Sequence, residues 1–218
     1  MKKNKKALVL AGSKGIGKSI FLELQKIIKN VNFTNSKDFD MSLPETPKLL
    51  INKYNNLDII VLNTGGPPMI DFYQIRNDQW IKYFNQLFLS FVRILQTIKI
   101  NKNGYVFLIS SSNIKEPHPS LALSNSYRVA LTSIFKTYST LVAKDNISCI
   151  NIMPGAIKTK RLETLVADMD AFEKLLPFNK TGNPKEIGLF ISSIISNNIK
   201  YLSGASINFD GANSKSLF

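Results

Sequence analysis

The sequence has few of the features that mark secreted or membrane proteins. It contains one cysteine, Cys149, in 218 residues, which excludes an intramolecular disulfide and favours a reduced, cytoplasmic setting. No apolar run is long enough for a transmembrane helix. The lysine-rich start, residues 1–6, precedes an apolar run that is too short for a secretory signal. We therefore expect a solvated basic tail that leads into a buried first strand.

Acidic residues are also scarce. The chain has 15 of them against 28 lysines and arginines, which gives a net charge of +13. A basic balance can indicate binding to nucleic acid or to a membrane surface. Here the lysines are spread along the whole chain, and no motif of the usual nucleic-acid-binding modules is present. We interpret the charge as a compositional bias toward Asn, Ile and Lys, and expect no nucleic-acid partner, no membrane partner and no metal.

The composition and patterning are those of a globular α/β protein. A hydrophobic content of 44% can supply a core, and the length fits one domain over residues 1–218. Apolar strand-like runs alternate with helical patterns, which is typical of a doubly wound, Rossmann-like parallel sheet with helices on both faces. The expected strands are Ala7–Ala11, Val31–Asn35, Ile59–Asn63, Tyr105–Ser110, Ile147–Met153 and Ala205–Phe209. The expected helices are Ile16–Lys29, Pro44–Asn55, Asn77–Ile100, Leu121–Ala143, Asp168–Leu175 and Pro184–Ile195.

A glycine-rich turn, Ala11–Gly17, follows the first expected strand and opens a helix. In dinucleotide-binding folds such glycines permit a tight turn, a close approach of backbone to pyrophosphate, and packing of helix on strand. We expect Gly12, Gly15 and Gly17 to serve these purposes in that order. Three glycines alone are a weak signal, but their position between a strand and a helix favours a phosphate site over a purely structural turn.

Small and polar residues follow three further strands. Asn63–Pro68, Ser110–Ser112 and Pro154–Thr159 each come where an expected strand ends. Each could be an ordinary turn. Because ligands of open α/β sheets bind outside the carboxyl ends of the strands, the agreement among four strand ends predicts one shared binding crevice.

Taken in order, these motifs and the tail Leu202–Gly211 resemble the short-chain dehydrogenase/reductase family, and most of all its 3-oxoacyl-carrier-protein reductases. Leu176–Ile187 is similar to the family's segment before its penultimate helix, so the resemblance covers nearly the whole chain. It implies a nicotinamide dinucleotide and hydride transfer to or from a small-molecule carbonyl or alcohol. The cofactor residues that it implies are Gly12, Ser13, Lys14, Gly15, Ile16, Gly17, Asn63, Thr64, Gly65, Arg128, Pro154, Gly155, Ile157 and Thr159.

The active site is where the sequence departs from the family. The family has a Ser, a Tyr thirteen residues later and a Lys four residues beyond that, with an assisting Asn upstream. The corresponding residues here are Ser111, Ser124, Arg128 and Leu87. The spacing is retained, but a serine hydroxyl is a poor acid and an arginine does not give up its proton in proteins. Only Ser111 keeps the family's residue type.

Three nearby residues could act as proton donor in place of the family's tyrosine. Tyr127 lies one helical turn from Ser124 and would either reach the crevice or face a neighbouring helix. Lys115 could donate if it is desolvated, and His118, the only histidine, belongs to the residue type that titrates near neutral pH. Each could equally be an exposed or packing residue. Cys149 lies within a strand and is expected to be a small core residue.

The second strand bears on the choice of cofactor. NAD-binding sheets place an acid after this strand, whereas NADP sites use basic residues for the 2′-phosphate. The strand end carries Ser36 and Lys37 instead, and Lys14 occupies a position where NADP-linked relatives carry a basic residue. NADP is therefore favoured over NAD. Asp40–Met41 is similar to the family's adenine contact.

Two segments are unusual in length or composition. Only 22 residues separate Asn35 from Asp58, which is too few for a complete strand–helix–strand–helix path. We expect the sheet to be shortened between its second and fourth strands, with a helix missing, a short or vestigial third strand and an open adenine pocket. Residues 158–182 are charged and resemble a flap over the crevice. Apolar residues expected to line the substrate pocket are Met69, Phe72, Leu162, Phe172 and Phe178.

Two functions remain open at this stage. The first is an NADP-linked reductase or dehydrogenase with a non-standard proton donor. The second is a dinucleotide-binding protein without redox turnover, such as a sensor or partner subunit. The family resemblance also implies a homodimer or homotetramer through the helices Asn77–Ile100 and Leu121–Ala143, whose apolar residues include Phe84, Leu87, Phe88, Phe91 and Leu95.

Overall fold

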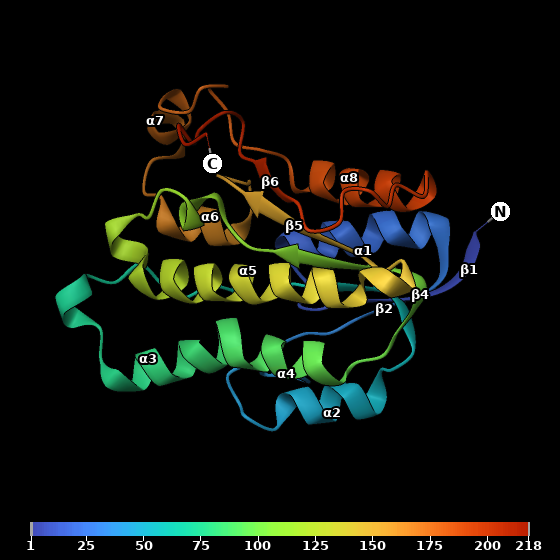
Figure 1. The fold of residues 1–218 in the computed structure, drawn as a ribbon. Helices are drawn as coiled ribbons and strands as arrows, with labels where there is room; N and C mark the ends of the chain where they lie inside the picture. The colour runs from blue at the N-terminus through green and yellow to red at the C-terminus, as the bar shows by residue number, and fades with distance from the viewer. Residues whose placement is uncertain (1, 218) are drawn as a thin grey trace.

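One parallel sheet organises the protein. The computed structural model describes residues 2–217, and six strands pair in the order β2-β1-β3-β4-β5-β6. All five pairings are parallel, which confirms the predicted doubly wound sheet (Figure 1). The strands are β1 (Lys3–Val9), β2 (Ile28–Phe33), β3 (Leu57–Leu62), β4 (Ile100–Ile109), β5 (Ser148–Pro154) and β6 (Ser206–Phe209).

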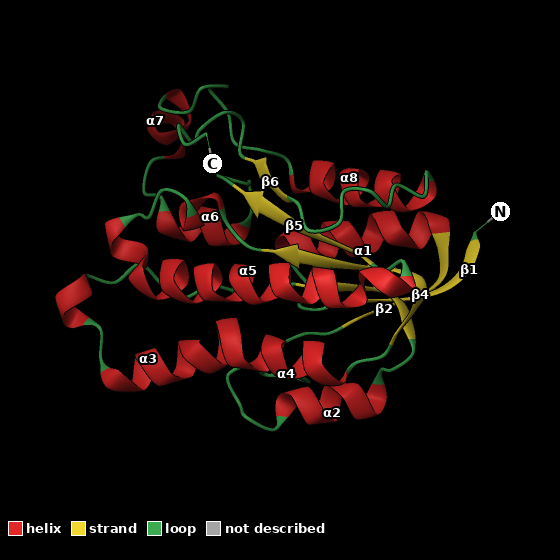
Figure 2. Ribbon diagram, in the orientation of Figure 1, coloured by secondary structure: helices red, strands yellow, loops and turns green. Residues whose placement is uncertain are grey.

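Helices cover both faces of the sheet. Figure 2 shows α1 and α8 side by side on one face, and α2, α3, α4 and α5 on the other. The helices on the sheet are α1 (Gly15–Ile27), α2 (Thr46–Lys53), α3 (Asn77–Phe84), α4 (Ser90–Thr97), α5 (Ala122–Val142) and α8 (Pro184–Ser196). Two short helices, α6 (Lys160–Leu165) and α7 (Met169–Lys174), lie beyond the carboxyl ends of the strands.

The two faces have separate apolar cores. In β3, Ile60 and Leu62 join the core beneath α2, α4 and α5, while Ile59 and Val61 join the core beneath α1 and α8. Successive side chains of a strand point to opposite faces, so a strand that is covered on both sides needs an uninterrupted apolar run. This explains why the inner strands lack an alternating polar pattern.

The sheet is shortened as predicted, and β2 is its edge strand. The chain passes from β2 through a loop at 34–45 directly to α2, and no strand is found there. The expected short third strand is therefore absent, whereas one helix of this region, α2, is retained. Beyond Ile28, the residues of β2 are partly or fully exposed, so the sheet edge beside the expected adenine pocket is open.

Several element boundaries differ from the prediction. Residues 3–6, expected in a solvated tail, form the first half of β1, and Lys6 N–H donates to Asp58 Oδ2 (2.7 Å). The helix expected at Asn77–Ile100 is divided by a π-helical turn at Asn85–Leu89 and ends at Thr97, because Ile100 begins β4.

The division of this helix changes which of its apolar residues are exposed. Leu87, Phe91 and Leu95 are buried in the core instead of forming an outward face. They are therefore unavailable for the dimer contact that the family resemblance implied for these helices. The outward apolar residues of α3 and α5 are a different set, namely Ile81, Val129, Ile134 and Leu141.

None of the helices among residues 2–217 is long and apolar enough to cross a lipid bilayer. Nor does this part of the chain bring together three or more His, Cys, Asp or Glu side chains in a group able to hold a metal ion. Cys149 is fully buried in β5, as expected of a core residue, and burial raises the pKa of its thiol to about 12.

Candidate active site at the carboxyl edge of the sheet

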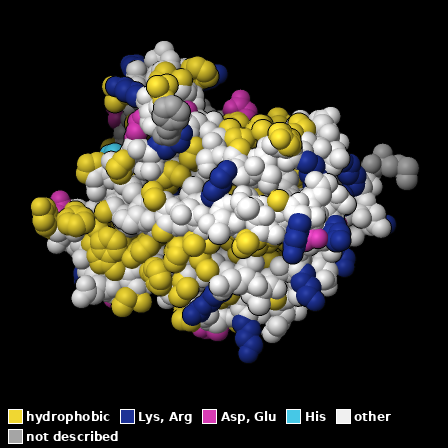
Figure 3. Space-filling view, viewed as in Figure 1, with side chains coloured by type: hydrophobic (Ala, Val, Ile, Leu, Met, Phe, Trp, Pro, Cys, Tyr) yellow, Lys and Arg dark blue, Asp and Glu magenta, His cyan; other side chains and the backbone are white. Residues whose placement is uncertain are grey.

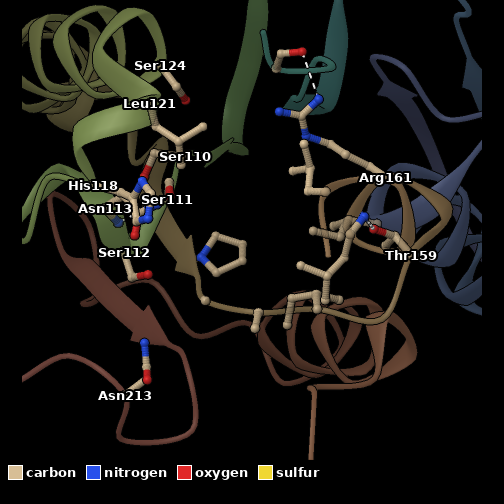
Figure 4. Close-up of a pocket in the computed structure, with 18 of the residues that line it drawn as sticks. Ser110, Ser111, Ser112, Asn113, His118, Leu121, Ser124, Thr159, Arg161 and Asn213 are labelled. Atoms are coloured by element: carbon tan, nitrogen blue, oxygen red, sulfur yellow. Dashed lines mark hydrogen bonds between the residues drawn. The ribbon is translucent and has the colours of Figure 1, made fainter. Parts of the chain in front are cut away.

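A cavity of about 670 Å³ opens where the predicted strand ends meet. Asn63 and Thr64 after β3, Ser110–Asn113 after β4, and Pro154–Ile157 at the end of β5 all line it. Ser124 and Arg128 reach it from α5. Figure 4 shows Ser110, Ser111, Ser112 and Asn113 on one side of this cavity, called the serine wall below, and Thr159 and Arg161 on the other. Three of the four expected strand ends therefore line one cavity, and Ile16 lines it from the glycine-rich turn after β1.

The glycine-rich turn differs in one detail from the expectation. The residue with left-handed backbone at the start of the turn is Ala11 (φ 48°), and Gly12 does not have a positive φ. A Cβ on Gly12 would lie 2.5 Å from Phe33 Cβ, so this glycine is needed for the approach of β2. Gly15 has a φ of +50°, and a Cβ on Gly17 would lie 2.3 Å from Ala11 O. The packing role of Gly17 agrees with the prediction, whereas the tight-turn role assigned to Gly12 belongs to Ala11.

These geometries predict opposite stability effects at neighbouring positions. Ala11→Gly is expected to be neutral or to stabilise by up to about 0.5 kcal/mol, because relief of the left-handed alanine offsets the greater freedom of glycine in the unfolded chain. Gly12→Ala is expected to destabilise by about 1–3 kcal/mol, because its Cβ overlaps Phe33. Urea unfolding of both variants measures the difference. A harmless Gly12→Ala would contradict this description of the turn.

The start of α1 is suited to a phosphate. Its N-cap residue, Lys14, makes no side-chain cap hydrogen bond, so the first backbone N–H groups lack a side-chain acceptor. Ser13, Lys14 and Gly15 are exposed, and Ile16 lines the cavity. Asn63 Nδ2 donates to Leu10 O (3.3 Å), which ties the end of β3 to the glycine turn. The exposed, uncapped helix start fits the diphosphate of a dinucleotide.

The loop after β2 holds both basic and acidic groups. Ser36 and Lys37 are exposed, in agreement with a site for a 2′-phosphate. Asp38 lies in the same turn, where its Oδ2 accepts from Asn35 Nδ2 (2.6 Å). The acid is thus engaged by an amide of its own turn. This hydrogen bond orients the Asp38 carboxylate toward Asn35 of its own turn.

Asp40 and Met41 have different surroundings from each other. Asp40 is exposed, and its Oδ1 accepts from both the backbone N–H and the hydroxyl of Ser42. The side chain of Met41 is buried in the core, and its carbonyl accepts from Ser90 Oγ (2.8 Å). The Met41 side chain is therefore a packing element beneath the loop, and Asp40 is the exposed member of the pair.

The residues at the family's catalytic positions form one hydrogen-bonded cluster. Arg128 Nε donates to Ser124 Oγ (3.2 Å), and Arg128 Nη1 donates to the carbonyl oxygen of Ile109 (3.0 Å). Ser111 Oγ accepts from the backbone N–H of Asn113 (3.2 Å). Each serine oxygen thus receives a hydrogen bond from the protein, and each hydroxyl proton is free to be donated into the cavity.

The electrostatics of this cluster are set by burial. Burial lowers the pKa of Arg128 to about 10, with a smaller contribution from the nearby positive charge of Arg161. The guanidinium remains protonated near neutral pH, so it supplies a fixed positive charge beside Ser124. Leu87, at the position of the family's assisting Asn, is buried in the core and does not line the cavity.

Two of the three candidate proton donors lie outside the cavity. Tyr127 packs against Trp80 and Phe84 of α3, and its hydroxyl donates to Trp80 O (3.0 Å). This is the neighbouring-helix alternative, and burial there raises the pKa of the phenol. Lys115 does not line the cavity either, because the helical turn Ser112–Ile114 carries it away from the serine wall. Their placement argues against both as donors to a ligand in this cavity.

Of the three candidate proton donors, His118 is the one that lines the cavity. Its Nδ1 accepts from the backbone N–H of Ser120 (3.2 Å). In the neutral imidazole the remaining proton therefore resides on Nε2. Figure 4 places His118 on the same side of the cavity as Ser111 and Asn113.

The comparisons with known proteins agree with this geometry. Residues 38–212 match the family described as enoyl-(acyl carrier protein) reductase. The fold resembles that of a short-chain dehydrogenase/reductase variant from Serratia marcescens, with a TM-score of 0.85, 21% identity, and coverage of 97% of this chain and 98% of the other. The chain belongs to the short-chain dehydrogenase/reductase family. The resemblance in the sequence motifs is thereby confirmed.

Other relatives within the short-chain family cover the chain equally well. The 3-oxoacyl-[acyl-carrier-protein] reductase of Rickettsia prowazekii is 24% identical, with 95% of each chain aligned. The uncharacterized oxidoreductase YvaG of Bacillus subtilis is 23% identical over 98% of this chain and 97% of its own. The structure of L-sorbose reductase from Gluconobacter frateurii, complexed with NADPH and L-sorbose, has a TM-score of 0.83 at 21% identity, covering 99% and 98% of the two chains.

The two ends of the segment 158–182, expected to be a flap, lie side by side and are joined by backbone hydrogen bonds. Lys158 N–H donates to Gly182 O (2.9 Å), and Gly182 N–H donates to Ala156 O (2.8 Å). Between these bonds the segment forms α6 and α7, whose apolar residues Leu162 and Phe172 line the cavity together with Met69. Phe72 and Phe178, also expected in the pocket, do not line this cavity.

Sequence reasoning missed Arg161. Its Nη1 donates to Gly66 O (2.9 Å), and its Nη2 donates to Pro67 O (2.5 Å), so α6 is tied to the loop after β3. In Figure 4 a dashed line at the Arg161 guanidinium marks one of these hydrogen bonds. No motif indicated it, because Arg161 lies between the motif Pro154–Thr159 and the segment Leu176–Ile187, in a stretch that has only the pattern of a charged helix. Residues of the short helices α6 and α7, including Arg161, therefore line one side of the cavity.

Proposed function

We propose that the protein is an NADP-dependent oxidoreductase that reduces a small-molecule carbonyl compound. The observation that carries this proposal is the convergence of Ser111, Ser124 and Arg128 in one cavity beside an exposed helix start. The serine hydroxyls are free to donate to a carbonyl oxygen, and Arg128 supplies positive charge next to them. The NADPH-bound structures of relatives support the choice of cofactor.

The chemistry divides between cofactor and chain. The reduced dinucleotide, when bound, supplies the hydride that is added to the carbonyl carbon. Gly12–Gly17, Asn63, Thr64 and the end of β5 would hold it, and Ile157 and Thr159 border the same cavity. The chain must then place a proton on the carbonyl oxygen. His118 Nε2 donates that proton, and because His118 is exposed, solvent can restore it.

A calorimetric titration tests the cofactor proposal. NADPH is expected to bind more tightly than NADH, because Lys14 and Lys37 are exposed beside the open edge of β2. Lys14→Met with Lys37→Met is expected to reduce the preference by about 5–10-fold, since two exposed contacts contribute roughly 1 kcal/mol together. Lys29→Met serves as a control, because Lys29 is an exposed lysine on β2 itself. Equal affinities for the two dinucleotides in the unaltered protein would contradict the proposal.

The alternative function is dinucleotide binding without turnover. It is favoured by the placement of Tyr127 and Lys115 outside the cavity, which leaves no residue of the family's donor type at the serine cluster. The two functions separate in one assay. A reductase consumes NADPH with a carbonyl panel, whereas a sensor or partner subunit binds NADPH and leaves it unchanged.

We also propose that the protein forms a homodimer or homotetramer through α3 and α5. Figure 3 shows a broad apolar area over these helices. Ile81 is 65% exposed and Val129 is 46% exposed, and such a patch on a folded surface favours association.

Light scattering tests the assembly. Ile81→Asp with Val129→Asp is expected to shift the protein to a monomer, while Leu22→Asp, at a position 46% exposed on α1, is expected to leave the assembly intact. A monomeric unaltered protein at micromolar concentration would count against the interface.

A further inference from the structure

The charges that line the cavity are all of one sign. The chain has four arginines, and two of them, Arg128 and Arg161, line this cavity. Among residues 2–217, no Asp or Glu is part of its lining. Neither guanidinium forms an ion pair with a carboxylate in this part of the chain. Arg128 is partly buried and Arg161 is exposed at the edge of the cavity. Two positive charges that line one cavity without a counter-charge favour an anionic ligand.

Arg161 is held in position and retains unused donors. Its two hydrogen bonds to Gly66 O and Pro67 O use two of the five N–H groups of a guanidinium. The acceptors are neutral carbonyls, so they orient the group without neutralising it. Burial lowers the pKa of Arg161, and its charge in turn depresses the pKa of Arg128. Both guanidiniums line the same cavity, and it is Arg128 that contacts Ser124, through Nε (3.2 Å).

The two arginines occupy different positions in the cavity. Arg128 is bound to Ser124 and to two strand-end carbonyls, and it belongs to the serine cluster. Arg161 comes from α6 and faces the serine wall from the opposite side (Figure 4). A ligand whose carbonyl oxygen lies at Ser111 and Ser124 would therefore present its far end to Arg161.

We infer that the substrate is an oxo acid, and that Arg161 binds its carboxylate. The inference rests on the proposed reductase function and names its substrate class. A carboxylate matches the planar guanidinium with two parallel hydrogen bonds. The body of the acid is apolar, because six apolar side chains from the loop after β3 and from segment 158–182 line the same cavity, namely Met69, Leu162, Leu165, Val166, Phe172 and Leu176.

Matched acids and esters test the inference. Benzoylformate and benzoylpropionate, which place the carboxylate at two distances from the ketone, are compared with their methyl esters as substrates for NADPH-dependent reduction. At least one acid is expected to exceed its ester in kcat/KM by about 10-fold or more, the usual size of a charged hydrogen-bonded contact. Arg161→Met is expected to bring that ratio close to one, chiefly through KM. Arg161→Lys is expected to keep part of it.

Arg93→Met is the matched control. Arg93 also donates to a backbone carbonyl, Pro44 O (2.9 Å), but it lies on α4 outside the cavity. Its removal takes away the same charge and the same kind of bond, and should leave the acid preference unchanged. Equal rates with both acids and their esters in the unaltered protein would overturn the inference. So would an Arg161→Met variant that binds NADPH about 10-fold more weakly with an unchanged acid-to-ester ratio, because the guanidinium would then serve the cofactor diphosphate.

A binding measurement separates this inference from the reductase proposal. Calorimetry of the NADP-loaded protein is expected to show binding of the preferred acid, weaker binding of its ester, and loss of the difference in Arg161→Met. If no carbonyl compound is reduced but this difference is found, the reductase proposal fails and the anion site stands. If the acid and the ester bind equally, the anion site fails whatever the turnover.

Discussion

Replacing Ser124 by Tyr together with Arg128 by Lys is expected to raise the rate of NADPH-dependent carbonyl reduction by up to about 100-fold, beyond the roughly 100-fold that His118 already contributes. A positioned general acid contributes roughly 10²–10⁴-fold, and the double change places a phenol at a position that lines the cavity beside Ser111. The lysine would lower the pKa of that phenol, as the family's arrangement implies. Steady-state rates against one ketone, with saturating NADPH, measure the gain.

The single variants are the controls for this gain. Ser124→Tyr alone is expected to gain less, because Arg128 remains bound to the carbonyl oxygens of Ile109 and Ser110. Arg128→Lys alone should not increase the rate, because it adds no acid at position 124. A double variant that binds NADPH normally and shows no gain would contradict the assignment of these two positions.

Replacing His118 by Gln is expected to lower the rate of the unaltered enzyme by about 100-fold, because it removes the proton donor of the proposed reaction. The glutamine retains a polar side chain of similar reach, so binding of NADPH should change little. Lys115→Met and Tyr127→Phe are the comparisons, since neither residue lines the cavity, and both variants should keep near-normal rates.

The two predictions can be combined. In a protein that already carries Tyr at 124 and Lys at 128, His118→Gln should have little effect, because the phenol then supplies the proton. An equal loss in both backgrounds would show that His118 supports the loop rather than the reaction. A loss of activity on Lys115→Met would instead move the donor to that lysine.

The sequence predicted the parts of the fold that depend on local patterns. The continuous apolar runs Ala7–Val9 and Ile59–Leu62 became inner strands, because strands covered on both faces need such runs. The shortage of residues between Asn35 and Asp58 predicted the shortened sheet, because chain length limits what a connection can contain. The predicted helix Pro44–Asn55 is present as α2 (Thr46–Lys53), whereas the complete absence of the short third strand was not predicted.

The residues of the candidate site that follow strand ends could be predicted from the sequence. Those whose role depends on the direction of the side chain could not. Ser111, Ser124 and Arg128 were found because their spacing matches that of the active-site residues of the family that the sequence resembles. Tyr127 has similar spacing, but its direction is set by contacts with Trp80 and Phe84, which lie more than 40 residues earlier. Arg161 was missed for the same reason, because its partners are the carbonyls of a distant loop.

Deuterium transfer tests the central claim most directly. The protein is mixed with one equivalent of NADPH that carries deuterium on the transferable position of the nicotinamide, and with a ketone or oxo acid in excess. The account predicts an alcohol that carries deuterium on its carbinol carbon, formed in equal amount to the NADP released. Tight binding of NADPH with no deuterated alcohol, in both the unaltered protein and the variant with Tyr at 124 and Lys at 128, would contradict it.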